Sequence, residues 1–160
     1  MIGLDIDGGL WTITLNRPDK ANSLTKAMLE DLDTLMVRAG TEGARAVILT
    51  GAGRVFSAGA DLDEARTGLA TDPVWERLST RIAALPCLTI AALNGTLAGG
   101  AMGMVLACDL RIAVAKAMLF YPVMRLGFLP QPSDPARMAA LIGPARAAMI
   151  LMAGAKVTAA

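Results

Sequence analysis

Two glycine-containing loops are the parts of the sequence whose residues and spacing could do chemistry. The first covers residues 56–62 (FSAGADL), and the second covers residues 94–101 (NGTLAGGA) and runs into a helical pattern. Gly59 can adopt a positive φ, and the alanines beside it leave the backbone amides uncovered. The helix after the second loop begins with N–H groups that have no partner inside the helix. Amides from two such loops, facing one another, would form a pocket for a developing oxyanion.

The glycines of the second loop also allow other interpretations. A phosphate-binding P-loop needs a terminal Gly-Lys-Ser/Thr, which this loop lacks, and the glycines do not fit the GxGxxG spacing. Composition alone favours a close-packed contact between helix and strand, because glycine also serves tight packing. The glycines concerned are Gly95, Gly99, Gly100 and Gly103.

Residue types that are missing or balanced exclude several classes of function. The chain has no histidine, and its two cysteines, Cys87 and Cys108, show no CxxC spacing. Zinc sites and Ser-His or Cys-His catalysis are therefore excluded within one chain, and we expect no metal site. The 15 basic and 14 acidic residues create no field for nucleic acid or an anionic membrane. Acids near the N-terminus replace the basic region of a signal peptide, so we expect a cytoplasmic, reducing location.

One uncharged stretch is long enough to be tested as a membrane span. Residues 82–108 carry no charged side chain, and a bilayer needs about 20 apolar residues. The stretch is interrupted by Pro86 and by Asn94-Gly95, which mark turns. We interpret it as a buried strand, a turn and a buried helix, and expect no membrane partner.

The two loops must be positioned by strands and helices that the hydrophobic pattern predicts. Residues 3–7 and 10–15 predict a hairpin, and strands are predicted at 46–50, 88–93, 110–113 and 118–121. The apolar run 46–50 (AVILT) is typical of a strand buried on both faces, and 88–93 is predicted as another buried strand. Helices are predicted at 25–39, 72–85, 99–107, 135–142 and 144–152, the first with Thr25 as N-cap and Gly40 as stop. Alternation of helix and strand after the hairpin predicts an α/β fold with right-handed crossovers.

Length and composition bound the organisation of the chain. The 160 residues suffice for one domain spanning 1–160. With 54% hydrophobic and 18% charged residues, the chain is poor in surface-forming residues, so we expect self-association or a piece of a larger protein. The segment from Gly154 onward gives no convincing stop, and we expect the natural structure to continue.

Three motifs together resemble the crotonase (enoyl-CoA hydratase/isomerase) superfamily. Residues 16–24 (NRPDKANSL) resemble its N-R-P-x-x-x-N-A-L segment, and residues 56–62 resemble its F-x-A-G-A-D-[IL] loop. Residues 94–113 resemble its N-G-x-x-x-G-G-G segment with the following C-D-x-x-x-A. The motifs occur in the family's order and spacing, and the resemblance covers nearly the whole chain.

The resemblance implies a fold, a substrate and a set of contacts. The fold would be the core of a crotonase-like ββα spiral, apparently without the C-terminal helices that cover the acyl pocket and build trimers; with that part present, a homotrimer or hexamer is implied. The substrate would be an acyl-CoA thioester, with CoA as part of the substrate and no permanently bound cofactor. The backbone amides of Ala60 and Gly100 would form the oxyanion hole. The residues expected to contact CoA are Ala58, Gly59, Asp61, Lys20 and Arg17, whereas Asp61 and Asp109 also match positions that the family uses as hydrogen-bond partners at a loop or helix end.

The sequence departs from the family at the positions that carry proton transfer. The two hydratase glutamates are matched by Gly103 and Val123, and the aspartate that some relatives use is matched by Gln131. Neither Gly103 nor Val123 can activate water or deliver a proton. The remaining candidates near the motif loops are Asp134, Glu64 and Tyr121, and Asp134 is also a candidate helix N-cap because it precedes Pro135.

Three functions therefore stay open at this stage. The chain could be an enzyme of acyl-CoA or fatty-acid metabolism that stabilises a thioester enolate, a lyase or isomerase by resemblance. Loss of both glutamates with intact loops would instead fit a non-catalytic acyl-CoA-binding relative. The abrupt C-terminal end would fit a truncated fragment.

Overall fold

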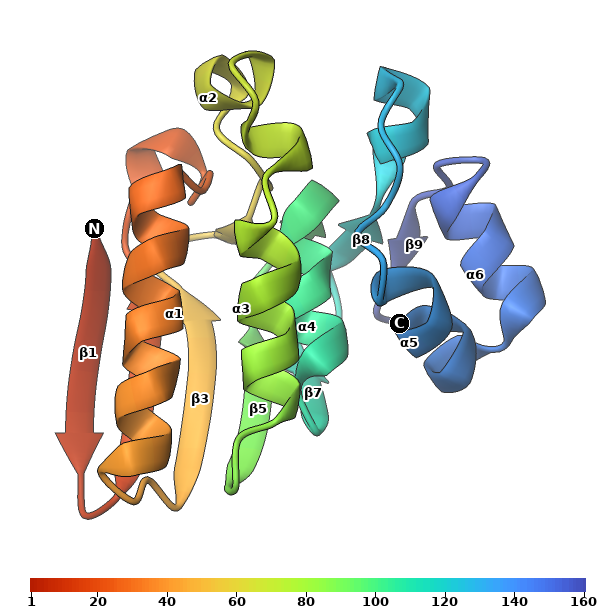
Figure 1. The fold of residues 1–160 in the computed structure, drawn as a ribbon. Helices are drawn as coiled ribbons and strands as arrows, with labels where there is room; N and C mark the ends of the chain where they lie inside the picture. The colour runs from red at the N-terminus through yellow and green to blue at the C-terminus, as the bar shows by residue number, and fades with distance from the viewer.

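A computed structural model describes all 160 residues, and its main feature is a five-stranded sheet (Figure 1). The strands are β1 (Ile2–Asp7), β2 (Leu10–Leu15), β3 (Ala46–Gly51), β5 (Leu88–Leu93) and β7 (Leu110–Ala113), in the order β1-β2-β3-β5-β7. The first two strands form the predicted antiparallel hairpin, whereas β2, β3, β5 and β7 run parallel to one another. Parallel strands end at the same edge of a sheet, so the loops after β3 and β5 come together there.

A second, smaller sheet lies beyond that edge. It contains β4 (Val55–Ser57), β6 (Thr96–Ala98), β8 (Met118–Phe120) and β9 (Val157–Thr158), in that order. Each of β3, β5 and β7 is followed by one short strand of this second sheet and then by helices. Repetition of this unit produces the ββα spiral that the resemblance implies. The sequence did not predict β9, which pairs antiparallel with β8.

Six α-helices and four 3₁₀ turns complete the chain. The helices are α1 (Lys26–Thr41), α2 (Leu62–Arg66), α3 (Val74–Ala83), α4 (Met102–Ala107), α5 (Asp134–Ile142) and α6 (Pro144–Leu151), and the 3₁₀ turns are η1 (Pro18–Lys20), η2 (Leu69–Thr71), η3 (Gly99–Ala101) and η4 (Pro122–Leu126). Thr25 caps α1 as predicted, because its hydroxyl accepts the N–H of Met28 at 3.2 Å. Gly40 does not end the helix. It packs against Leu85, and the chain turns only at Gly43, which has a φ of 72°.

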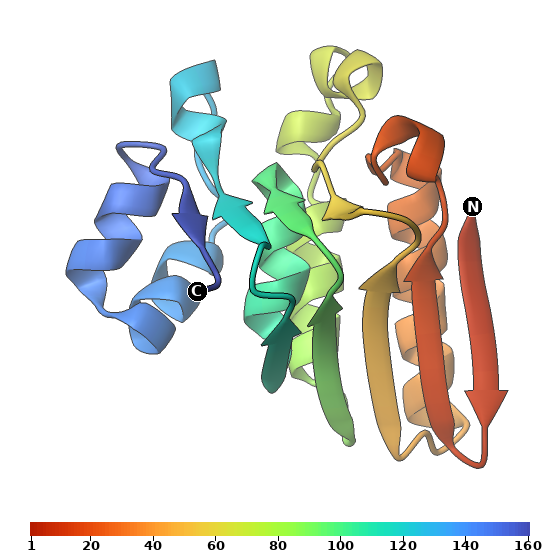
Figure 2. The ribbon, with the colours of Figure 1, turned by 180° about the vertical axis from the view of Figure 1, so that it is seen from behind.

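Helices cover only one face of the five-stranded sheet. Figure 1 shows α1, α3 and α4 in front of it, and Figure 2 shows the opposite face without a helix. In β3, Val47 and Leu49 are buried while Ile48 between them is half-buried. The prediction that β3 and β5 are buried on both faces is therefore wrong for this chain. A continuous apolar run indicates that both faces of a strand could be buried, but here helices cover only one face of the sheet.

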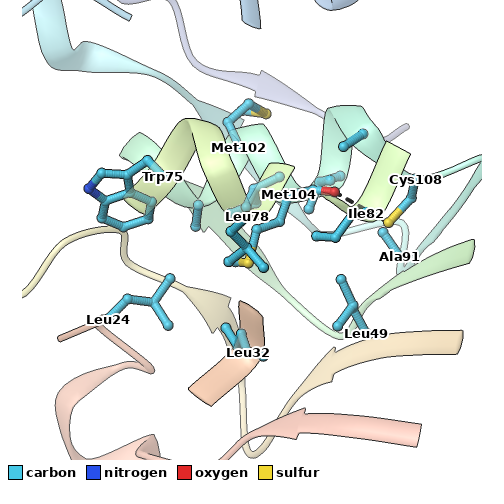
Figure 3. Close-up of a cluster of buried hydrophobic side chains, with 14 of the residues drawn as sticks. Leu24, Leu32, Leu49, Trp75, Leu78, Ile82, Ala91, Met102, Met104 and Cys108 are labelled. Atoms are coloured by element: carbon cyan, nitrogen blue, oxygen red, sulfur yellow. Dashed lines mark hydrogen bonds between the residues drawn. The ribbon is translucent and has the colours of Figure 1, made fainter. Parts of the chain in front are cut away.

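The hydrophobic core lies between the covered face and the three helices. Figure 3 shows this layer: Leu78 and Ile82 of α3 and Met104 of α4 lie near Leu32 of α1 and Leu49 of β3. This layer fixes α4, and with it the glycine run that precedes α4, against the sheet. The uncharged stretch 82–108 folds into β5, β6, η3 and α4, as interpreted from its turn residues. None of the helices combines the length and the apolar character that crossing a membrane requires.

Candidate active site

The loop after β4 leaves a single backbone amide free. Ala58 N donates to Ala21 O at 3.0 Å, and Asp61 N donates to Leu24 O at 2.8 Å. Gly59 N donates to the hydroxyl of Ser57 at 3.1 Å. Among the four consecutive amides from 58 to 61, only that of Ala60 has no acceptor within the protein. The sequence thus folds this loop so that one N–H remains available.

The second loop meets the first at two glycines. Gly59 has a φ of 93° and Gly99 a φ of 58°, both in the region that favours glycine. A β-carbon on Gly59 would lie 2.9 Å from Ala98 O and 3.3 Å from Gly99 Cα, which is closer than side chains tolerate. Gly100 follows as the second residue of η3, so its N–H has no acceptor earlier in that turn. The sequence left tight packing and uncovered amides as alternative explanations of the glycines. The contacts at Gly59 and Gly99 show the tight packing, and it does not exclude the uncovered amides.

Ala60 and Gly100 line the same pocket. Its volume is about 140 Å³, and 13 of its 17 lining residues are hydrophobic. Trp75 forms one wall: its ring carbons lie 3.3 Å from the position of a β-carbon on Gly100, and its indole N–H donates to Leu69 O at 2.8 Å. The pocket is therefore largely apolar, and its lining includes Ala60, whose amide has no acceptor in the protein, and Gly100.

The segment from Arg17 to Leu24 holds the first loop from outside. The guanidinium of Arg17 forms an ion pair of 2.8 Å with Asp61, and the same nitrogen donates to the carbonyl and hydroxyl of Ser23. This contact, with the N–H groups of Asp63 and Glu64, holds the pKa of the Asp61 carboxyl below its usual range. Asp61 also caps the N-terminus of α2. It therefore acts as a hydrogen-bond partner at a helix end, as the resemblance implies.

Asn22 is the second anchor of that segment. It is fully buried with a φ of 52°, and its amide donates to Ala52 O at 2.9 Å and Val55 O at 2.7 Å. Its side-chain oxygen accepts the N–H of Arg17 at 2.9 Å. These bonds explain in physical terms why the motif needs an asparagine here.

Of the residues expected to contact CoA, only Ala58 lines the pocket. Ala58 is exposed and lines the pocket, whereas Gly59 is buried between the two loops. Lys20 is exposed in η1, with no ion pair or side-chain hydrogen bond. Ala21, directly after Lys20, accepts the amide of Ala58, so the lysine is placed next to this loop.

Asp134 is not the helix cap that its position before Pro135 suggested. It is the first residue of α5 and fully buried, and its side chain makes no capping bond. Glu76 of α3 takes the capping role, because its carboxylate accepts the N–H of Ser133 at 3.1 Å and also the hydroxyl of Ser133. The capping interpretation therefore fails because a carboxylate from a distant helix satisfies the helix end.

Asp134 instead forms a buried pair with Tyr121. The tyrosine hydroxyl donates to Oδ2 of Asp134 at 2.7 Å, and Oδ1 has no hydrogen-bond partner. Burial, together with the charge of Glu76, outweighs the Tyr121 hydrogen bond and the Arg137 charge and raises the pKa of Asp134 to about 6. Burial and the carboxylate also raise the pKa of Tyr121.

The other candidates for proton transfer lie differently. Glu64 accepts the N–H of Lys26 at 2.7 Å, at the start of α1, and does not line the pocket. Val123 and Gln131 do line it, whereas Gly103 is buried with the Asp134 carboxylate beside it. Asp109 accepts the N–H and hydroxyl of Thr89, both at 2.8 Å, so its role is structural as expected.

Sequence reasoning missed two residues of this region. Trp75 and Glu76 both fall within the predicted helix 72–85, and neither was predicted as part of the site. Helical spacing places Trp75 in the core correctly, but no local pattern tells that its ring lies over Gly100. The contact from Glu76 to Ser133 joins residues 57 positions apart, beyond any local pattern.

Comparisons with known proteins identify the family and agree with the fold. The family described as enoyl-CoA hydratase/isomerase matches residues 5–160, so the chain belongs to this family. The solved structures similar to the chain have the crotonase fold. YngF of Bacillus subtilis, named as an enoyl-CoA hydratase/isomerase, is 41% identical over 92% of this chain and 59% of its own length. A Rhodobacter capsulatus protein named as an enoyl-CoA hydratase is 38% identical over 91% of this chain and 58% of its own length.

Solved structures give the same result. The crystal structure of an enoyl-CoA hydratase from Bacillus anthracis superposes with a TM-score of 0.87 at 36% identity, over 99% of this chain and 64% of that one. A protein of this kind from Streptomyces coelicolor A3(2) gives a TM-score of 0.91 at 31% identity, over 99% and 62%. The chain thus spans about three fifths of the length of these relatives.

Proposed function

We propose that this chain binds an acyl-CoA thioester and stabilises its enolate with the backbone amides of Ala60 and Gly100. One observation carries the proposal: among the amides of residues 58–61 only that of Ala60 has no acceptor in the protein, and Ala60 shares a largely apolar pocket with Gly100. A thioester oxygen gains negative charge when the α-proton leaves, and fixed N–H donors in a dry site stabilise that charge without reorganising. The reaction would belong to acyl-CoA or fatty-acid metabolism and would need no permanently bound cofactor.

The CoA part of the substrate would lie across the exposed side of the first loop. Ala58 is exposed at the pocket, which supports its carbonyl as the partner of the adenine. Lys20 has no partner in the protein, which supports a contact with a CoA phosphate. Arg17 is already paired with Asp61, so we assign it first to holding the loop that carries Ala60.

The full activity would involve more protein surface than this chain supplies. Large apolar side chains are exposed on the uncovered sheet face and on α5 and α6, among them Leu88, Ile112, Leu141 and Met149. Exposed apolar area of this kind marks surfaces that pack against other protein. This supports the trimer or hexamer that the resemblance implies, formed when the C-terminal part of the family is present.

The test is thermal unfolding with and without acetoacetyl-CoA. A ligand that binds only the native state, at a hundred times its Kd, adds about 2.7 kcal/mol to the free energy of unfolding. Free CoA is the control, because it lacks the thioester oxygen. We expect the thioester to raise Tm more than CoA does. Equal shifts would contradict the oxyanion role, and no shift with either ligand would contradict the proposal as a whole.

A second candidate function rests on the two glutamate positions. Val123 lines the pocket as an apolar side chain, and Gly103 offers no side chain at all. Loss of both carboxylates with intact binding loops supports a relative that holds acyl-CoA without turnover. Deuterium uptake at the α-carbon of a bound thioester separates the two functions, because a pure binding protein leaves that proton in place.

A further inference from the structure

The Asp134 carboxylate of α5 lies where a side chain at position 103 of α4 would begin. A β-carbon on Gly103 would lie 3.0 Å from Oδ1, 3.2 Å from Oδ2 and 3.5 Å from Cγ of Asp134. A longer side chain at position 103 and the Asp134 carboxylate cannot occupy this space together. The resemblance implies a hydratase glutamate at position 103, so a carboxylate from α5 lies beside the position where that glutamate is missing.

The Asp134 carboxylate is only half satisfied. Asp134 is 0% exposed, and its Oδ1 atom has no hydrogen-bond partner. A buried, unpaired carboxylate oxygen is costly, and native proteins rarely keep one without a reason such as catalysis. The folded protein holds this group against that cost with one hydrogen bond, from Tyr121.

Tyr121 connects this carboxylate to the pocket. It lines the same pocket as Ala60 and Gly100, and its hydroxyl donates to Asp134 while accepting the N–H of Gln131 at 3.4 Å. Gly100 and Gly103 are three residues apart and so lie on the same side of the turn into α4. Asp134, which lies beside Gly103, is therefore on the side of this turn that also carries Gly100.

We propose that Tyr121 and Asp134 form the proton-transfer pair for the α-carbon of the bound acyl-CoA thioester. The inference rests on the proposed function, because it needs a thioester whose oxygen is held by Ala60 and Gly100. Tyr121 is the catalytic residue, since it faces the pocket. Asp134 acts through the tyrosine and positions it.

The proposed step transfers two protons in a relay and shifts two electron pairs. As the α C–H bond breaks, its proton goes to the oxygen of Tyr121, while the Tyr121 O–H proton passes to Oδ2 of Asp134. The electron pair of the C–H bond becomes the enolate double bond, and the charge moves to the thioester oxygen. Reversal of the step returns a proton to the α-carbon, so the net change in deuterated water is exchange of hydrogen for deuterium.

The groups around the pair set its pH dependence. Glu76 of α3 faces Asp134 with negative charge, Arg137 of α5 faces it with positive charge, and Tyr121 supplies the hydrogen bond. Together with burial they place the pKa of Asp134 at about 6. A base must be ionised to accept a proton, so exchange should increase with pH and level off above about pH 6.

The experiment measures α-deuterium uptake into butanoyl-CoA in deuterated buffer, alongside thioester binding by thermal shift. The variants are Asp134→Asn and Tyr121→Phe, and the exposed Asp63→Asn is the matched control. We expect both site variants to bind the thioester within about twofold of the unaltered protein and to lose exchange by about 100-fold or more. The control should keep both properties.

Each other outcome overturns a defined part of the argument. Binding without exchange in the unaltered protein overturns the proton-transfer pair and leaves the binding function standing. Unchanged exchange in the two variants, or binding and exchange lost in parallel, overturns the pair as well. No binding by the unaltered protein overturns the proposed function and the pair with it. If the variants fail to fold, the pH profile of the unaltered protein decides: exchange above background that stays constant from pH 5 to 8 overturns the pair.

Discussion

The carbonyl oxygen of Arg54 lies where a side chain of Gly95 would begin. A β-carbon on Gly95 would be 1.9 Å from Arg54 O and 2.8 Å from Arg54 C. Next to it, the Asn94 side chain accepts the N–H of Gly51 at 3.1 Å and donates to Gly53 O at 2.9 Å. The Asn-Gly pair therefore holds the end of β3 against the turn between β5 and β6, which fixes the distance between the two site loops.

Gly95→Ala should strongly destabilise the fold. The contacted atoms are backbone, so they cannot move aside as a flexible side chain can, and we expect a loss of about 3 kcal/mol or more in the free energy of unfolding. Urea denaturation measures it. Gly40→Ala is the control: its β-carbon would meet Leu85 at an ordinary 3.6 Å inside α1, and it should add about 1 kcal/mol of stability. Equal effects of the two substitutions would contradict the packing argument.

Gly59→Ala should abolish thioester binding as well as lower stability. The φ of 93° is strained for alanine, and its β-carbon would lie 2.9 Å from Ala98 O, so the two loops must separate. We expect a stability loss of about 1–3 kcal/mol and no rise of Tm with acetoacetyl-CoA. Gly43→Ala carries similar φ strain at 72° with no atom within 4 Å. That control should lose some stability and keep the ligand-induced shift, and a G59A protein that keeps the shift would contradict the role of this contact.

The ion pair of Arg17 and Asp61 should make stability fall at acidic pH. The folded-state pKa of Asp61 is lowered, so its contribution is present above the ordinary pKa near 3.8 and is lost as pH falls through the folded value. Unfolding curves at pH 7 and pH 3 for Arg17→Met, Asp61→Asn and the double variant give the coupling energy. We expect about 1 kcal/mol at pH 7 and a smaller value at pH 3. A coupling that is equal at both pH values would show that the pair does not act through the Asp61 charge.

The two site loops could be predicted from the sequence because each is a local pattern of small residues after an apolar run. The loop at residues 56–62 and the glycine run before α4 occur where the motifs placed them. Most strands and helices were also found, since alternation and helical spacing are properties of neighbouring residues.

The environment of Asp134 could not be predicted in the same way. A local rule assigned it as a cap, but Glu76 from α3 satisfies that helix end instead, and the hydroxyl that binds Asp134 comes from Tyr121, 13 residues earlier. The uncovered sheet face follows the same logic. The sequence of β5 shows that Ile90, Ala91 and Ala92 are apolar, but it does not show which face the helices cover.

Ionisation of the buried Asp134 should lower the free energy of unfolding as pH rises. Its folded-state pKa of about 6 lies above the ordinary 3.8, so the native state keeps a proton that the unfolded chain releases. The stability this proton provides is fully present below about pH 4 and is lost as pH rises through about 6, up to about 3 kcal/mol.

Asp134→Asn cannot ionise and can still accept the Tyr121 hydrogen bond. We therefore expect the variant to gain stability relative to the unaltered protein between pH 5 and pH 8, measured by urea unfolding at both values. Asp63→Asn, whose side chain is 92% exposed, should show no such trend. A D134N protein that is destabilised equally at pH 5 and pH 8 would mean that Asp134 is held for packing, because only a group that must be buried as a charge is relieved by removing that charge.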